Sequence, residues 1–188
     1  MSNRPPLPGK SKTPKSSPRI GEMLRVDHAG EYAAVAIYEA QAKVFGRSPR
    51  TKTIATEMRH MREEEQEHLD AFDGLLREHK TRPTAMMPLW HFASKTLGTV
   101  TALMGEKAAH ACTEAVETVI EQHYAAQITE TKDSHPELCA KFTQFREDEL
   151  SHRDHAVAEG AHDAPAYGLL SAAIKAGCRT AIKISEKI

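Results

Sequence analysis

The chain has 188 residues, of which 40% are hydrophobic, 27% are charged and only 5% are aromatic. This length and composition are typical of one folded globular domain rich in helix, and they argue against a β-sandwich. The formal net charge of −1 gives no indication of nucleic-acid binding. The three cysteines lie far apart and include no Cys-x-x-Cys pair, which argues against a disulfide framework.

The first 19 residues differ in composition from the rest of the chain. They contain five of the ten prolines and five basic residues, and no acidic residue. This composition predicts a disordered leader, residues 1–19, followed by a single domain, residues 20–188. The leader lacks the apolar stretch of a secretory signal, and its prolines make a mitochondrial presequence a weak alternative. A basic tail of this kind can also contact anionic lipid.

Apolar residues recur every three or four positions in five segments, which predicts five helices. The predicted helices span residues 21–45, 49–78, 88–131, 136–160 and 167–187. No segment alternates in the way that a half-buried strand does. We therefore expect an all-α fold, an antiparallel four-helix bundle with an added C-terminal helical segment.

Two stretches, REEEQEHLD and REDELSHRD, share one skeleton and contain the same Glu-x-x-His pair. The pairs are Glu65 with His68, and Glu149 with His152. Each pair occupies one helix face that is otherwise apolar, where a carboxylate is unfavourable unless it is paired or bound to a metal. The neighbouring acids lie off this face, and we interpret them as a solvated surface: Glu63, Glu64, Glu67, Glu147 and Asp148.

A second repeat lies in the first and third predicted helices and has the form Glu-x6-Tyr-x2-Gln. Its copies are Glu31, Tyr38 and Gln41, and then Glu117, Tyr124 and Gln127. Periodicity alone does not decide between Glu114 and Glu117, but the repeat selects Glu117. Four inward carboxylates and two inward imidazoles are the ligand set of a di-iron or di-manganese helical bundle. Zinc more often takes ligands rich in nitrogen and sulfur.

Several residues near these motifs have two interpretations. Tyr38 and Tyr124 lie two turns from the glutamates and are either hydrogen-bond donors and electron relays, or core residues. His123 has the same two interpretations. Asp70 and Asp154 follow each histidine by two positions, so we expect neither to pair with the histidine of its own helix.

Two apolar segments exceed what a four-helix core needs. AMMPLWHFASKTLGTVTALMG, residues 85–105, has one charged residue, and the C-terminal segment is apolar on one face and basic on the other. Proline, histidine and threonine make the first segment a poor membrane span. Both segments either lie on a membrane surface or line an apolar channel, or they simply pack on the bundle.

Longer motifs resemble one family, the demethoxyubiquinone hydroxylases of ubiquinone biosynthesis. These motifs are RVDHAGEYAA, RPTAMMPLW, ACTEAVETVIEQHY, FREDELSHRDHA and APAYGLLSAAIKAGCRTAI, and the resemblance covers residues 19–188. It implies a ferritin-like di-iron monooxygenase that binds the membrane peripherally. The ligands implied for two iron ions are Glu31, Glu65, His68, Glu117, Glu149 and His152.

The resemblance also implies a reaction and its partners. Dioxygen is used to hydroxylate the ring of demethoxyubiquinone or its quinol, a substrate with an isoprenoid tail. Electrons come from reduced nicotinamide, directly or through the quinone, and His123 and Tyr124 match a histidine–tyrosine pair that is a possible relay. The chain has no GxGxxG motif, so no Rossmann cofactor domain is expected in it.

The resemblance implies further partners and a cellular location. Members of the family often work with a lipid-binding or scaffold protein. They act on the cytoplasmic face of a bacterial inner membrane or the matrix face of the mitochondrial one. The lack of a convincing mitochondrial presequence favours the bacterial location.

Two alternatives belong to other functional classes. A ferroxidase or iron-storage bundle would use the same ligands but needs no apolar segments. In a non-enzymatic helical protein that binds a partner, the repeated motif would only place polar residues in the core.

Overall fold

A computed structural model describes residues 17–188 and confirms the all-α fold. Its main helices are α1 (Pro18–Phe45), α2 (Lys52–Glu78), α3 (Met87–Met104), α4 (Glu106–Thr131), α5 (Pro136–Ala158) and α6 (Tyr167–Ser185). Two short 3-10 turns, η1 (Pro49–Thr51) and η2 (Ala161–Asp163), precede α2 and follow α5. The part of the chain that is described contains no strand.

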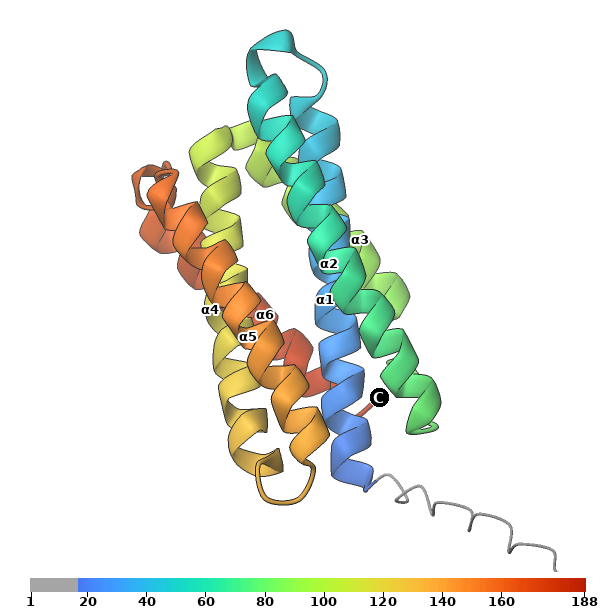
Figure 1. Cartoon of the computed structure of the whole chain (residues 1–188). Coiled ribbons are helices and arrows are strands. Elements are labelled where there is room, and N and C mark those ends of the chain that lie inside the picture. Colours follow the sequence, from blue (N-terminus) through green and yellow to red (C-terminus); the bar gives the residue numbers. More distant parts are fainter. Residues whose placement is uncertain (1–16) are drawn as a thin grey trace, which may run out of the picture.

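The bundle consists of two helical hairpins, each with a third helix beside it (Figure 1). The α1/α2 hairpin carries α3, which packs on α1, and the α4/α5 hairpin carries α6, which packs mainly on α4. Each half of the structure therefore contains three helices, one more than the hairpin that carries the sequence repeat.

The long helix predicted for residues 88–131 was wrong, because Gly105 divides it into α3 and α4. Gly105 has φ of 114°, a left-handed conformation that glycine adopts without strain. The chain changes direction there, so that α4 enters the bundle while α3 runs along its outside (Figure 1). Apolar periodicity is present on both sides of Gly105 and does not reveal the break.

The N-terminal end of α1 lies slightly before the predicted domain start. The Ser17 side chain accepts a hydrogen bond from the Ile20 backbone N–H, and Pro18 occupies the first turn. Arg19, assigned to the leader by composition, is helical and pairs with Glu130 of α4 at 2.8 Å and with Glu186 at 3.2 Å. The rest of the predicted leader, residues 1–16, lies outside the described residues.

Two of the buried apolar clusters lie toward opposite ends of the bundle. One joins Leu24 and Phe72 to Phe142 and Phe145, and the other joins Phe45 and Met58 to neighbouring residues. The glutamates of both repeats lie along the helices between these clusters, so apolar packing surrounds them on both sides.

Small residues set how closely α3 approaches α1. The buried positions of α3 are Ser94, Gly98, Thr101 and Ala102, while Leu89, Phe92, Val100 and Leu103 face outward. A Cβ atom at Gly98 would overlap the carbonyl oxygen of Ile37 and lie 3.1 Å from the Ala40 Cβ. Only glycine therefore permits this approach.

Replacing Gly98 with alanine should lower the free energy of unfolding by ~1–3 kcal/mol, as overpacking generally does. The matched change Gly74→Ala, in α2, has open space around the new methyl group. It should be neutral or stabilise the chain by ~0.5–1 kcal/mol. Urea denaturation measures both, and equal stability of the two variants would contradict the close packing of α3 on α1.

Candidate metal centre

Six side chains from four helices converge in the middle of the bundle. They are Glu31 of α1, Glu65 and His68 of α2, Glu117 of α4, and Glu149 and His152 of α5. All six are buried, with at most 8% of each residue exposed. The structure thus brings together every residue that the sequence predicted as a ligand.

The six residues form two overlapping groups. Glu31, Glu65, His68 and Glu149 make one group, and Glu65, Glu117, Glu149 and His152 make the other. Within each group, one donor atom per residue lies within 4.8 Å of all the others. Glu65 and Glu149 belong to both groups, which is the position of carboxylates that bridge two ions.

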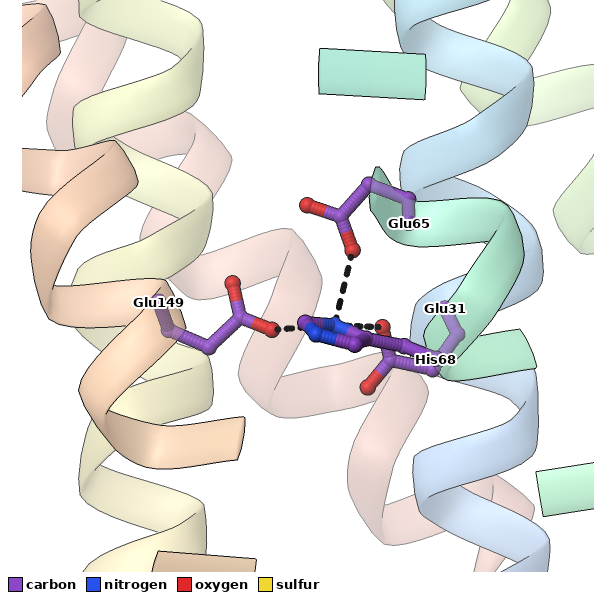
Figure 2. Close-up of side chains that lie close together, drawn as sticks. All are labelled: Glu31, Glu65, His68 and Glu149. Carbon is purple, nitrogen blue, oxygen red and sulfur yellow. Dashed lines mark ion pairs between the residues drawn. The ribbon is translucent and has the colours of Figure 1, made fainter. Parts of the chain in front are cut away.

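The imidazoles face the carboxylates through the same ring nitrogen. His68 Nδ1 lies 3.6 Å from Glu31 Oε2 and from Glu65 Oε2, and 3.5 Å from Glu149 Oε1. Figure 2 shows this arrangement, with Glu149 reaching from the opposite hairpin. His152 Nδ1 lies 3.1 Å from Glu65 Oε1 and 3.6 Å from Glu149 Oε2.

Several buried atoms at this centre have no hydrogen-bond partner. They are both carboxylate oxygens of Glu65 and of Glu149, and the Nδ1 atoms of His68 and His152. Leaving such atoms unsatisfied in the core is unfavourable by ~1–3 kcal/mol each, more if charged. Carboxylate oxygens and imidazole nitrogens are donors that iron and manganese accept, so the residues fit two such ions.

Burial and mutual interaction shift the pKa values of these groups apart. Burial raises the pKa of Glu31 and of Glu117 well above the usual carboxyl value. Burial also disfavours ionised Glu65, but the two neighbouring histidines prevail and lower its pKa to about 2. Burial likewise opposes protonation of His152, yet the carboxylates raise its pKa to about 11. A metal ion would replace these imidazole protons and release them on binding.

The other nitrogen of each imidazole is held by an acid from the opposite hairpin. His68 Nε2 lies 3.2 Å from Asp148 Oδ2, and His152 Nε2 lies 3.3 Å from Glu64 Oε2. These acids, each with 44% of the side chain exposed, were predicted to form only a solvated surface, and that prediction was wrong. The signal was the acid before the glutamate in both copies of the repeat. Such partners fix the ring orientation and the tautomer of a metal-binding histidine.

The tyrosines of the second repeat are also paired across the hairpins. Tyr38 donates a hydrogen bond to Glu117 Oε1 at 2.9 Å, and Tyr124 donates one to Glu31 Oε1. Burial raises the pKa of both phenols well above the usual value, so they remain donors. The sequence left open whether they are hydrogen-bond donors or only core residues; they are buried and they donate, whereas a role in electron transfer stays a prediction.

The remaining residues singled out in the sequence lie apart from the cluster. His123 does not reach the six residues; its Nε2 lies 3.4 Å from Asp27 Oδ1. Glu114 turns toward α6 and pairs with Lys175 at 2.9 Å, so Glu117 is the one inside the cluster. Asp154 pairs with Arg153, and Asp70 accepts a hydrogen bond from Gln66; as expected, neither contacts the histidine of its own helix.

An apolar cavity of 470 Å³ lies between α1, α3, α4 and α6. Nearly all its lining is apolar, including Ile37, Leu97, Val116 and Ile174. Ile37 and Val116 also lie beside Tyr38 and Glu117, around a gap too small to hold a water molecule. The apolar cavity therefore adjoins the six-residue cluster.

Replacing Asp148 with asparagine should weaken metal binding by about 10–100-fold, because His68 loses its carboxylate partner. The control Asp154→Asn, in the same helix, should leave the affinity unchanged. Titration of the metal-free chain with Mn²⁺, followed by the free-ion signal in electron paramagnetic resonance, measures both. The same affinity in the two variants would refute the role of Asp148.

Comparison with known proteins agrees with this geometry. Residues 18–185 match the family model described as ubiquinone biosynthesis protein COQ7. The chain is 46% identical over 182 residues to 3-demethoxyubiquinol 3-hydroxylase of Rhodospirillum rubrum, covering 97% of this chain and 83% of the relative.

Eukaryotic relatives match over similar lengths. The mitochondrial NADPH-dependent 3-demethoxyubiquinone 3-hydroxylase of Homo sapiens is 40% identical over 173 residues, with 90% of this chain and 78% of the relative covered. The mitochondrial 5-demethoxyubiquinone hydroxylase of Saccharomyces cerevisiae is 36% identical, with the same coverage. The chain therefore belongs to the COQ7 family of ubiquinone biosynthesis proteins.

Proposed function

We propose that this chain is a di-iron monooxygenase that hydroxylates the ring of demethoxyubiquinone or demethoxyubiquinol in ubiquinone biosynthesis. The observation that carries the proposal is the pair of four-residue groups that share Glu65 and Glu149, beside an apolar cavity. Relatives that are 36–46% identical carry hydroxylase names. These names and the cavity favour this function over the ferroxidase or iron-storage alternative, which has no use for a large apolar cavity.

The six buried side chains would hold two iron ions, with one histidine for each and Glu65 and Glu149 shared between them. When bound, the irons would supply the activation of dioxygen. The residues around them keep the ligands in place: Tyr38 and Tyr124 hold Glu117 and Glu31 through hydrogen bonds. Because both phenols stay protonated, they neutralise part of the carboxylate charge without adding their own.

The apolar cavity would bind the quinone substrate and part of its isoprenoid tail. Its lining comes from α1, α3, α4 and α6 and offers few polar atoms, so it excludes water from the approach to Tyr38 and Glu117. Reduced nicotinamide is the proposed electron donor, with His123 and Tyr124 as a possible relay. Tyr124 touches a ligand, while His123 lies near the surface with 15% of its side chain exposed.

The outer face of α3, formed by Leu89, Phe92, Val100 and Leu103, would rest on a membrane. These residues are 48–70% exposed, and their spacing places them along one side of the helix. Within residues 17–188, none of the helices has the length and apolar character required to cross a bilayer. We infer peripheral binding, to the cytoplasmic face of a bacterial inner membrane or the matrix face in a mitochondrion, with a lipid-binding or scaffold protein as a possible partner.

His152→Ala should abolish quinone hydroxylation, because it removes a ligand and leaves Glu64 without its partner. The control His135→Ala, at the turn between α4 and α5, should retain activity. The test is chromatography of quinones from cells that lack the activity and express each variant. Demethoxyubiquinone should disappear with the wild-type chain and with the control, but accumulate with His152→Ala. Accumulation that persists with the wild-type chain would contradict the proposed function.

Phe92→Ser and Leu103→Ser should together reduce binding to vesicles of phosphatidylethanolamine and phosphatidylglycerol by about tenfold or more, since each removes a large apolar side chain from the bilayer. Val157→Ser, at an exposed apolar position of α5, should not change it. Vesicle co-sedimentation gives the bound fraction, and unchanged melting temperatures show that the variants are folded. Equal binding of the wild-type chain, the Phe92→Ser/Leu103→Ser double variant and Val157→Ser would exclude the outer face of α3 as the contact.

A further inference from the structure

A second, polar cavity of 440 Å³ opens on the opposite side of the six-residue cluster, between α2 and α5. Of its lining residues, four are acids, four are histidines, and only Met61 and Ser151 are neither. No lysine or arginine is among them. Because His68 and His152 form part of the wall, the cavity leads from the surface to the cluster. Its charge favours the entry of cations.

Carboxylate–imidazole pairs join α2 and α5 along this cavity. Two of them hold the ligand histidines, Glu64 with His152 and Asp148 with His68. A third pair lies further out, where His155 Nε2 is 2.9 Å from Glu57 Oε1. Glu57 is seven residues before Glu64, so it lies about 10 Å along the helix from it. The outer pair serves neither ligand histidine and needs a separate explanation.

His110 of α4 approaches the outer pair from inside the bundle. Only 3% of His110 is exposed, and its Nδ1 atom has no hydrogen-bond partner. That atom points at Glu57 Oε1, which is 3.8 Å away, too far for a hydrogen bond. His110 precedes Glu117 by seven residues, so both lie on the same face of α4. Its unsatisfied nitrogen is therefore aimed at the outer pair, on the side that leads to the cluster.

We propose that Glu57, His110 and His155 form a third site for a divalent transition-metal ion, which captures iron before it passes to the six-residue cluster. Two imidazoles and one carboxylate are a ligand set that zinc and ferrous iron both accept. The capture of a metal ion stands on this geometry alone, whereas delivery to the cluster rests on the proposed function.

The three side chains lie near one another, and a rotation of His155 would bring them onto one ion. The His110 and His155 rings meet edge-on with centroids 6.2 Å apart, and both flank Glu57. His155, with 46% of its side chain exposed, can rotate, while buried His110 is fixed. Burial lowers the pKa of His110, so its ring is neutral and has a free lone pair for a metal. An exposed, mobile ligand beside a fixed one suits a site that binds and releases an ion.

The first test locates the third ion. Crystals of the iron-loaded chain are soaked in zinc, and anomalous maps are collected at the iron and zinc absorption edges. We expect zinc between Glu57, His110 and His155 in the wild-type chain and in Glu67→Gln, and none there in Glu57→Gln. Glu67→Gln is the matched control, because it removes the same charge from the same cavity. No zinc at these residues in the wild-type chain, or zinc retained in Glu57→Gln, would overturn the proposal.

The second test measures delivery. Metal-free chain is mixed with ferrous iron without oxygen, and unbound iron is trapped at intervals by a coloured chelator. Glu57→Gln and His155→Ala should take up iron roughly tenfold more slowly than the wild-type chain, while Glu67→Gln should stay within about twofold of it. With two ferrous ions supplied per chain, all should end with both irons in the six-residue cluster.

The outcomes of the second test separate the two proposals. Equal slowing by Glu57→Gln and Glu67→Gln would mean that only overall charge matters, and the capture role would be wrong. A wild-type chain that takes up no iron would instead contradict the di-iron function, and the zinc maps would still decide the third site.

Discussion

The structure depends on keeping four carboxylates and two imidazoles in the middle of an apolar bundle. Phe72, Phe142 and Phe145 pack on one side of this cluster, and Phe45 and Met58 on the other. The facing oxygen atoms of Glu65 and Glu149 are buried and find no hydrogen-bond partner in the protein. Two cations would compensate both the charge and the missing hydrogen bonds, which would couple metal binding to the stability of the core.

The internal repeat explains how this cluster is held in place. Each hairpin supplies the hydrogen-bond partners for the other: Tyr38 of α1 holds Glu117 of α4, and Tyr124 of α4 holds Glu31 of α1. The histidines follow the same rule, since each is paired with an acid from the facing helix. Neither hairpin alone can therefore orient its own ligands, and the site forms only when the two halves pack together.

Much of this site could be predicted from the sequence because helical periodicity shows which side chains share a face. Glu65 and His68 lie in phase with the core, and the spacing of the second repeat selected Glu117 over Glu114. Periodicity within one helix carries no information about partners on another, so it missed the roles of Glu64 and Asp148. It also missed the break at Gly105, where the left-handed backbone interrupts the helix while the apolar pattern continues.

Sequence periodicity is equally uninformative about the outer surfaces of the bundle. The composition of residues 85–105 indicated an apolar segment that either lies on a membrane or lines a channel, or packs on the bundle. The small residues around Gly98 decide which side of α3 faces α1. The outward side is the more apolar one, the reverse of an ordinary surface helix. The grouping of Glu57, His110 and His155 could not be foreseen either, since these residues come from three helices and share no motif.

The central claim is that Glu65 and Glu149 are shared between two metal ions. Anomalous diffraction at the iron absorption edge, from crystals of the chain grown with ferrous iron, tests it most directly. The account predicts two iron peaks about 3.5–4 Å apart, with both of these glutamates touching both ions. A single iron, or two irons too far apart for one carboxylate to bridge, would contradict it.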